Sequence, residues 1–150
     1  MLSSRNKQGL TEREIARCEQ IWVLLDGNGC CGMVTSEAHL SGSRTRFSQT
    51  VNLVYLGADA LPSSGVHARS RMSEVACLAH ELAHAQRFRM GIDRPVKQPA
   101  VFLDEAEASL HASFMQRIGF LDRRDLVEDA RFQIAEWQKA DEDQEEANES

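Results

Sequence analysis

The amino-acid sequence predicts a single α+β domain in which helices surround a small sheet. Apolar residues recur at helical spacing in four segments, near residues 11–25, 73–85, 99–118 and 122–139. Residues 45–56 instead alternate apolar and polar side chains as a strand does. The chain has 150 residues, of which 42% are hydrophobic and 27% charged, and this composition is typical of one soluble domain with its own core.

The first helix is predicted to begin at a capping box, in which the side chains of Thr11 and Glu14 bind each other's backbone N–H groups. Its inward face consists of Ile15, Cys18, Ile21, Trp22 and Leu25. Turn-forming residues at 26–29 are expected to end the helix. Residues 1–9, which precede it, are expected to be flexible.

Strand signals follow in two places. Residues 30–40 indicate a weak short strand with a turn, and residues 41–43 form a loop. Residues 45–56 are the strongest strand segment, because their alternation leads into a continuous apolar run. The next segment, residues 57–69, is rich in turn formers and leads directly into the second helix, so we expect it to line the rim of a cleft there.

The second helical segment contains His80-Glu81-Leu82-Ala83-His84, which fits the pattern H-E-x-x-H. Histidines four positions apart lie on one face of a helix, so their imidazoles can bind one metal ion together. Glu81 is rotated by about 100° from the first histidine. From that position its carboxylate can take a proton from water that the metal activates.

The surroundings of the motif favour a metal site over a surface helix with two solvated histidines. Residues 73–85 are largely apolar around both histidines. Ser70 or Ser73 can cap the start of this helix, and Gly91 can end it. A catalytic zinc site needs a third protein ligand and an open fourth position, so we expect a further ligand elsewhere in the chain.

The third helix, predicted over residues 99–118 between a proline and a glycine, supplies the candidates for this ligand. Glu105 and Glu107 are the two main candidates, and Asp104 is a weaker one. Glu107 has a competing structural role, because Asp104 and Glu107 match a capping box. We favour Glu105, which gives a site of two histidines and one glutamate.

With these residues, the chain resembles a small gluzincin-type zinc metallopeptidase, such as the thermolysin-like and ImmA/IrrE-like proteases. In that group a ligand glutamate follows H-E-x-x-H on a later helix, and residues 105–109 (EAEAS) fit this setting with Glu105 as ligand. The resemblance covers about residues 70–114 and implies a minimal zincin-like fold with two or three antiparallel strands before the active helix, one of them along the cleft. It departs at Ser109, where these families often carry an aspartate or asparagine that orients a ligand histidine.

Other reactive side chains near these segments are assigned structural roles. His67 is expected to be an exposed loop histidine rather than a transition-state donor, and Tyr55 to pack on the core rather than act as an oxyanion donor. His111 is six positions after Glu105 and therefore points away from the ligand face. Cys77 is expected to be a small core residue.

The last helix is predicted from Asp122 to about residue 139, so that residues 1–140 form the domain. Six of the 23 acidic residues lie in the last ten positions, and residues 141–150 are expected to form a disordered acidic tail. This charge argues against nucleic acid as a partner. A local basic cluster consists of Arg87, Arg89, Arg94 and Lys97. It is interpreted as a solvated face, with binding of an acidic substrate segment as the alternative.

The leading functional hypothesis is a peptidase in which His80, His84 and Glu105 bind Zn²⁺ and Glu81 is the catalytic base, with a protein or peptide as substrate. The alternatives are a non-catalytic binding or regulatory module with this fold, and an interaction protein that acts through its acidic tail. The sequence has no apolar run of about 18 residues and no apolar signal segment, so a cytoplasmic protein without membrane contact is expected. Its four cysteines lack metal or disulfide spacing, which agrees with reduced thiols. The oligomeric state is not predicted.

Overall fold

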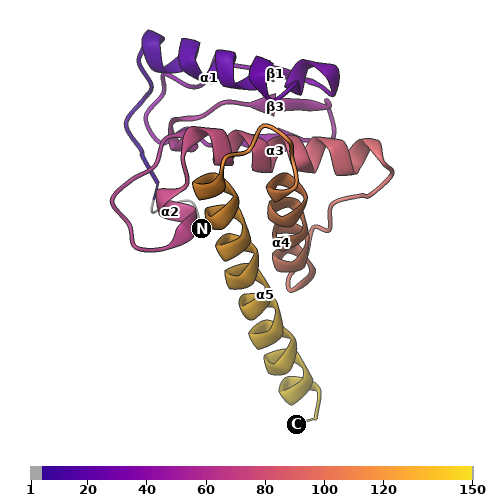
Figure 1. Ribbon diagram of the computed structural model, residues 1–150. Coiled ribbons are helices and arrows are strands. Elements are labelled where there is room, and N and C mark those ends of the chain that lie inside the picture. The colour runs from indigo at the N-terminus through magenta and orange to yellow at the C-terminus, as the bar shows by residue number, and fades with distance from the viewer. Residues whose placement is uncertain (1–4, 150) are drawn as a thin grey trace.

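The central element of the computed structural model, which describes residues 5–149, is helix α3 (Glu74–Arg89). It contacts helix α1 (Glu12–Leu24) and two strands of the sheet, as well as helices α4 (Ala100–Ser113) and α5 (Phe120–Glu149). Figure 1 shows α4 and α5 as an antiparallel pair that extends away from α1, α3 and the sheet. Because α3 has neighbours on several sides, every residue from 78 to 85 is buried.

Helix α1 agrees with the prediction from the sequence. The Thr11 side chain accepts a hydrogen bond from the Glu14 backbone N–H at 3.2 Å, and the Glu14 carboxylate accepts one from the Thr11 N–H at 2.9 Å. The indole N–H of Trp22 donates to the Cys31 carbonyl at 3.2 Å, which joins the helix to the start of the sheet. The turn after the helix requires glycine at position 27, because a Cβ there would lie 2.2 Å from the Trp22 ring.

The sheet differs from the predicted one in two respects. Its strands are β1 (Gly32–Val34), β2 (Arg46–Ser48) and β3 (Leu53–Tyr55), in the order β1-β3-β2. Strand β2 pairs antiparallel with β3, but β1 pairs parallel with it, so the expected antiparallel pairing is wrong for β1. Residues 45–56 were expected to form one strand, and they form a hairpin in which Asn52 takes a left-handed conformation with φ of 54°.

The N-terminal segment is held against the body of the protein from Arg5 onward. The Arg5 side chain is 3% exposed and its guanidinium donates to three backbone carbonyls. The acceptors are Asp59 O at 2.5 Å, Arg69 O at 2.6 Å and Ala60 O at 2.8 Å. The expected flexible start is therefore wrong for residues 5–9, while residues 1–4 lie outside the described part of the chain.

The predicted ends of α3 are confirmed. Ser73 is the N-cap, and its side chain accepts a hydrogen bond from the Ala76 N–H at 3.2 Å. Gly91 follows the helix with φ of 92°, a conformation that side chains with a Cβ rarely adopt. Helix α4 begins after Pro99 as expected but ends at Ser113, earlier than predicted.

Helix α5 is longer than predicted and continues to Glu149. Residues 141–149, which were expected to form most of a disordered tail, are helical turns beyond the body of the protein, and residues 142–149 are exposed (Figure 1). Residue 150, the last of the expected tail, lies outside the described part of the chain. Alanine, glutamate and glutamine have high helix propensity, and they extend the helix although this part has little to pack against. None of the helices within residues 5–149 combines the length and apolar character that a membrane span requires.

Candidate metal centre

The three predicted ligands converge on one point between α3 and α4. The Nε2 atom of His80 lies 2.6 Å from Oε2 of Glu105, and Nε2 of His84 lies 3.1 Å from the same oxygen. The two Nε2 atoms are 3.2 Å apart. Tetrahedral zinc with bonds of about 2.0–2.1 Å has ligand atoms about 3.3 Å apart. These three atoms could therefore hold one metal ion after small adjustments.

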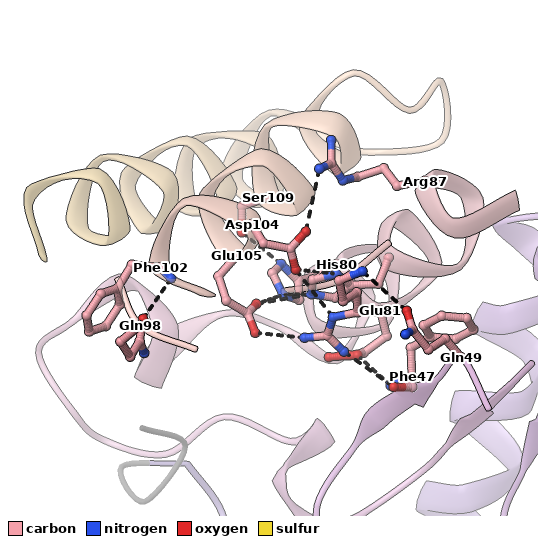
Figure 2. A network of polar contacts seen from close by, with 12 residues as sticks. Phe47, Gln49, His80, Glu81, Arg87, Gln98, Phe102, Asp104, Glu105 and Ser109 are labelled. Carbon is pink, nitrogen blue, oxygen red and sulfur yellow. Dashed lines mark hydrogen bonds and ion pairs between the residues drawn. The ribbon is translucent and has the colours of Figure 1, made fainter. Parts of the chain in front are cut away.

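The packing of α3 and α4 explains why these ligands meet. His80 and His84 are one helical turn apart, with ring centroids separated by 4.7 Å, and both are buried. The facing surface of α4 is made of small residues, so the two helices approach closely. These residues are Ala108, Ser109 and Ala112, all of which are fully buried. Figure 2 shows Glu105 of α4 facing His80 of α3 across the space between the helices.

The ring of His80 is oriented by a hydrogen-bonded chain that leads to α5. Nδ1 of His80 lies 2.8 Å from the Ser109 hydroxyl, which donates to Oδ2 of Asp129 at 2.7 Å. Asp129 also accepts two hydrogen bonds from Arg69, both at 2.9 Å. Because the hydroxyl proton is directed to Asp129, Ser109 accepts the proton on Nδ1, which leaves Nε2 of His80 as a lone-pair donor for a metal.

Ser109 and Asp129 together lie behind His80, where the sequence resemblance led us to expect one acidic or amide side chain. Ser109 carries a hydroxyl and no carboxylate, and the carboxylate that its hydroxyl contacts belongs to Asp129 on α5. Sequence reasoning missed Asp129. The available signal was its position among the core-facing residues of α5, next to Ala130 and one turn from Leu126, where an unpaired acid would be costly.

Asp104 lies behind His84 rather than among the ligands. Its carboxylate is 3.6 Å from Nδ1 of His84, a buried nitrogen that makes no hydrogen bond within the described residues. Arg94 and Arg87 hold the same carboxylate from the other side, at 3.3 and 3.5 Å. A small movement of His84 would therefore give it an Nδ1–carboxylate contact like those that commonly orient metal-binding histidines.

The rival ligand Glu107 lies outside the metal group. Arg87 donates to its carboxylate at 2.6 Å, and 45% of the Glu107 side chain is exposed. The capping box that Asp104 and Glu107 were thought to form does not occur, because α4 begins at Ala100 and both residues lie inside the helix. The position of Glu105 beside both histidines agrees with its choice over Glu107.

The remaining reactive side chains lie apart from the three ligands. His67 packs against Phe132 with ring centroids 5.6 Å apart. The guanidinium of Arg46 lies over the Tyr55 ring, 4.4 Å from its centroid. His111 contacts Gln86 at 2.8 Å. Cys77 is partly buried at the cavity wall, and burial raises the pKa of its thiol to about 12, so the thiol is protonated at neutral pH.

Glu81 lies at the wall of a cavity of about 460 Å³ that His80 and Glu105 also line. Its Oε2 atom accepts a hydrogen bond from the backbone N–H of Phe47 at 3.0 Å, and the residue is 9% exposed. Figure 2 shows Glu81 turned toward Phe47. The edge strand β2 therefore contacts the carboxylate predicted to be the catalytic base, and this carboxylate is not among the metal-binding atoms.

The charges of the centre are coupled. Burial alone would lower the pKa of His80, but the adjacent Glu105 carboxylate raises it overall. Burial would raise the pKa of Glu105, yet the two imidazoles hold it well below its usual range. Burial also opposes ionisation of Asp129, while its hydrogen bonds to Arg69 lower its pKa. Both carboxylates are thus ionised at neutral pH, which suits a site for a cation.

Replacing Ser109 with alanine is expected to lower metal affinity by about 10–100-fold, because His80 loses the acceptor that orients its ring. Competition titration with a chromogenic chelator measures this change. The matched control is Ser113→Ala, since Ser113 lies one turn further along α4, is buried, and has a hydroxyl that bonds only to the Leu110 carbonyl within the described residues. Equal affinities for the two variants would contradict the role given to Ser109.

Comparisons with protein-family models, curated proteins and solved structures find no match for this chain. The functional interpretation therefore depends on the geometry of the site. The structure shows a mixed α+β fold, and the site contains two histidines and one glutamate that could hold a metal ion.

Proposed function

We propose that the protein is a zinc-dependent metallopeptidase of the minimal gluzincin kind, which hydrolyses a peptide bond in a protein or peptide substrate. One observation carries this proposal. The ligand atoms of His80, His84 and Glu105 lie within 4.8 Å of one another, and Glu81 lines the same cavity as His80 and Glu105. A metal group beside a cavity with a separate carboxylate is the arrangement that metal-assisted hydrolysis requires.

The chemistry of the donor atoms fits zinc. Two neutral imidazole nitrogens and one carboxylate oxygen form the ligand set of many catalytic zinc sites. The hydrogen bond from Nδ1 of His80 to Ser109 leaves Nε2 available for the metal. Glu105 is oriented as well, because Arg94 lies 3.3 Å from its Oε1 atom while Oε2 faces the histidines. We therefore assign His80, His84 and Glu105 to a Zn²⁺ ion.

The catalytic step is assigned to Glu81. Zinc in such a site lowers the pKa of water and polarises the substrate carbonyl. The Glu81 carboxylate takes the proton from the attacking water and passes it to the leaving amine nitrogen. The Phe47 N–H that binds Oε2 keeps this carboxylate at the cavity wall, and Oε1 has no hydrogen-bond donor among the described residues.

The proposal also includes the kind of substrate and the cellular compartment. A small body favours a narrow protein target over general digestion. We place the protein in the cytoplasm, and its four cysteines, all free thiols, agree with a reducing compartment. Neither a membrane nor a nucleic acid is needed as a partner for this chemistry.

Metal analysis combined with an activity assay tests the proposal. The purified protein is expected to hold one zinc ion per chain by mass spectrometry of the metal content, and to cleave a denatured protein or members of a peptide library. Chelation should remove both properties and added zinc should restore them. A folded chain that binds no divalent metal would contradict the centre itself. Stoichiometric zinc without cleavage of any substrate would favour the alternative, a binding or regulatory module.

A further inference from the structure

The cavity beside the metal centre has a wall rich in arginine. Its lining contains five arginines and two glutamates, and the positive charges therefore exceed the negative ones by three. The arginines are Arg5, Arg44, Arg46, Arg69 and Arg94. The glutamates are Glu81 and Glu105, which are already assigned to proton transfer and metal binding. The whole chain carries a net charge of −6, so the sign of charge at the cavity is opposite to that of the protein.

Arg69 and Arg94 are paired with acidic residues of α4 and α5. Arg69 donates twice to Asp129 at 2.9 Å, and Arg94 lies 3.3 Å from both Asp104 and Glu105. These pairs join α4 and α5 to the metal centre, so their charges are largely balanced within the protein. The excess positive charge therefore belongs to the other three arginines.

Arg44 and Arg46 are exposed at the rim of the cavity; Arg46 is the first residue of β2, and Arg44 precedes it by two positions. The Arg44 side chain forms no hydrogen bond or ion pair with the described residues. Arg46 lies 3.3 Å from Glu37, and its guanidinium also donates to the Arg44 carbonyl and stacks on the Tyr55 ring. About half of the Arg46 side chain is nevertheless exposed, and a surface ion pair of this kind is weak, so the guanidinium is accessible to a further carboxylate. Strand β2 also carries Phe47, whose N–H binds the Glu81 carboxylate. Both guanidinium groups thus belong to the segment that contacts the proposed catalytic base.

Arg5 adds a buried charge to the same wall. The hydrogen-bond partners of its side chain are three neutral backbone carbonyls, and no carboxylate of residues 5–149 is within ion-pair distance. Because Arg5 is 3% exposed, salt screens its field less than it screens the field of a surface charge.

From this arrangement we propose that the cleft recognises acidic peptide segments, with aspartate or glutamate side chains of the substrate bound by Arg44 and Arg46. Guanidinium and carboxylate groups form charge-assisted and often bidentate hydrogen bonds, and a positive cavity also attracts such segments from a distance. The cleavage of these segments depends on the proposed peptidase function, whereas their binding does not.

The arginines of the cavity wall are not the basic cluster that the sequence analysis identified, which consists of Arg87, Arg89, Arg94 and Lys97. Of its four members, only Arg94 lines the cavity. Arg87 is bound to Glu107 at 2.6 Å, and Arg89 donates to the Gly29 carbonyl at 2.8 Å. The binding of an acidic segment is therefore assigned to the arginines of the cavity wall, which come from distant positions in the sequence, and not to this cluster.

Peptide binding tests the proposal without relying on cleavage. The zinc-loaded Glu81→Gln protein is titrated against three fluorescein-labelled peptides that differ only in carrying glutamate, glutamine or lysine at matched positions. The glutamate peptide is expected to bind about tenfold more tightly than the glutamine peptide, with an advantage that shrinks as salt is added. The lysine peptide should bind most weakly. Equal binding of the three peptides would overturn the proposal.

Variants of Arg44 and Arg46 test whether these two arginines cause the preference for the glutamate peptide. In the Glu81→Gln protein, the further substitutions Arg44→Glu and Arg46→Glu should remove the preference for the glutamate peptide. The neutral substitutions Arg44→Gln and Arg46→Gln should leave about half of the preference, measured as the logarithm of the affinity ratio. The control is Arg13→Glu, an exposed arginine of α1 that does not line the cavity, and it should change nothing. A preference that survives both double variants would refute the assignment, provided that circular dichroism shows them folded.

The unmodified protein separates this inference from the proposed function. If it cleaves the glutamate and glutamine peptides with equal kcat/KM, the peptidase assignment stands and acidic recognition fails. If the glutamate peptide binds selectively and no peptide is cleaved at any zinc concentration, acidic recognition stands and the peptidase assignment fails.

Discussion

Replacing Glu105 with alanine is expected to reduce zinc affinity by more than about 100-fold, since removal of a direct ligand should cost more than removal of its supporting contacts. The residue supplies the only carboxylate oxygen of the described group, with Oε2 at 2.6 and 3.1 Å from the two Nε2 atoms. Two histidines alone leave the ion with incomplete protein coordination. Competition titration and metal analysis of the purified variant measure the loss.

Glu107→Ala is the matched control for this experiment. It removes one carboxylate from the same helix, two positions away, and thus has the same effect on net charge. Its carboxylate contacts Arg87 and is absent from the metal group, so zinc content should be unchanged. The opposite result, zinc lost with Glu107→Ala and kept with Glu105→Ala, would mean that the wrong glutamate has been assigned.

Replacing Glu81 with glutamine is expected to leave zinc bound while lowering kcat by about 10²–10⁴-fold, the usual contribution of a general acid–base group. The amide has the same shape as the carboxylate, and its oxygen can still accept the hydrogen bond from Phe47. It cannot hold the proton released by the attacking water. Steady-state kinetics on a cleaved peptide and metal analysis of the same preparation measure both properties.

Glu74→Gln provides the comparison for Glu81→Gln. Glu74 is in the first turn of the same helix, where it contacts Arg17 at 2.9 Å, and it does not line the cavity. Its replacement should leave kcat unchanged. Full activity of Glu81→Gln would exclude Glu81 as the base, and loss of zinc from that variant would show that the residue supports the metal centre instead.

Features that depend on neighbouring residues could be predicted from the sequence. The capping box of Thr11 and Glu14 and the N-cap at Ser73 are present as expected. The spacing of His80 and His84 also places both imidazoles on one face. All of these involve residues three or four positions apart, and helix geometry alone brings such residues together.

The errors concern where a strand ends, which strands pair, and how far the last helix extends. The hairpin in residues 45–56 was read as one strand, because the apolar pattern continues across its turn. The parallel pairing of β1 has no counterpart in the local pattern. Residues 141–149 were assigned to a disordered tail from their charge, although their helix propensity is high.

The sequence by itself determined the chemistry available to this protein: two histidines and a glutamate on one helix, and a small set of acids on the next from which a third ligand could be chosen. Only the tertiary structure decided how that chemistry is arranged. It placed Glu105 rather than Glu107 beside the histidines, connected His80 through Ser109 to Asp129, and grouped the arginines of the cavity wall. The physical reason is distance along the chain. Ser109 and Asp129 are 20 positions apart, and Arg5 and Arg69 are 64 apart, so neither contact follows from local periodicity.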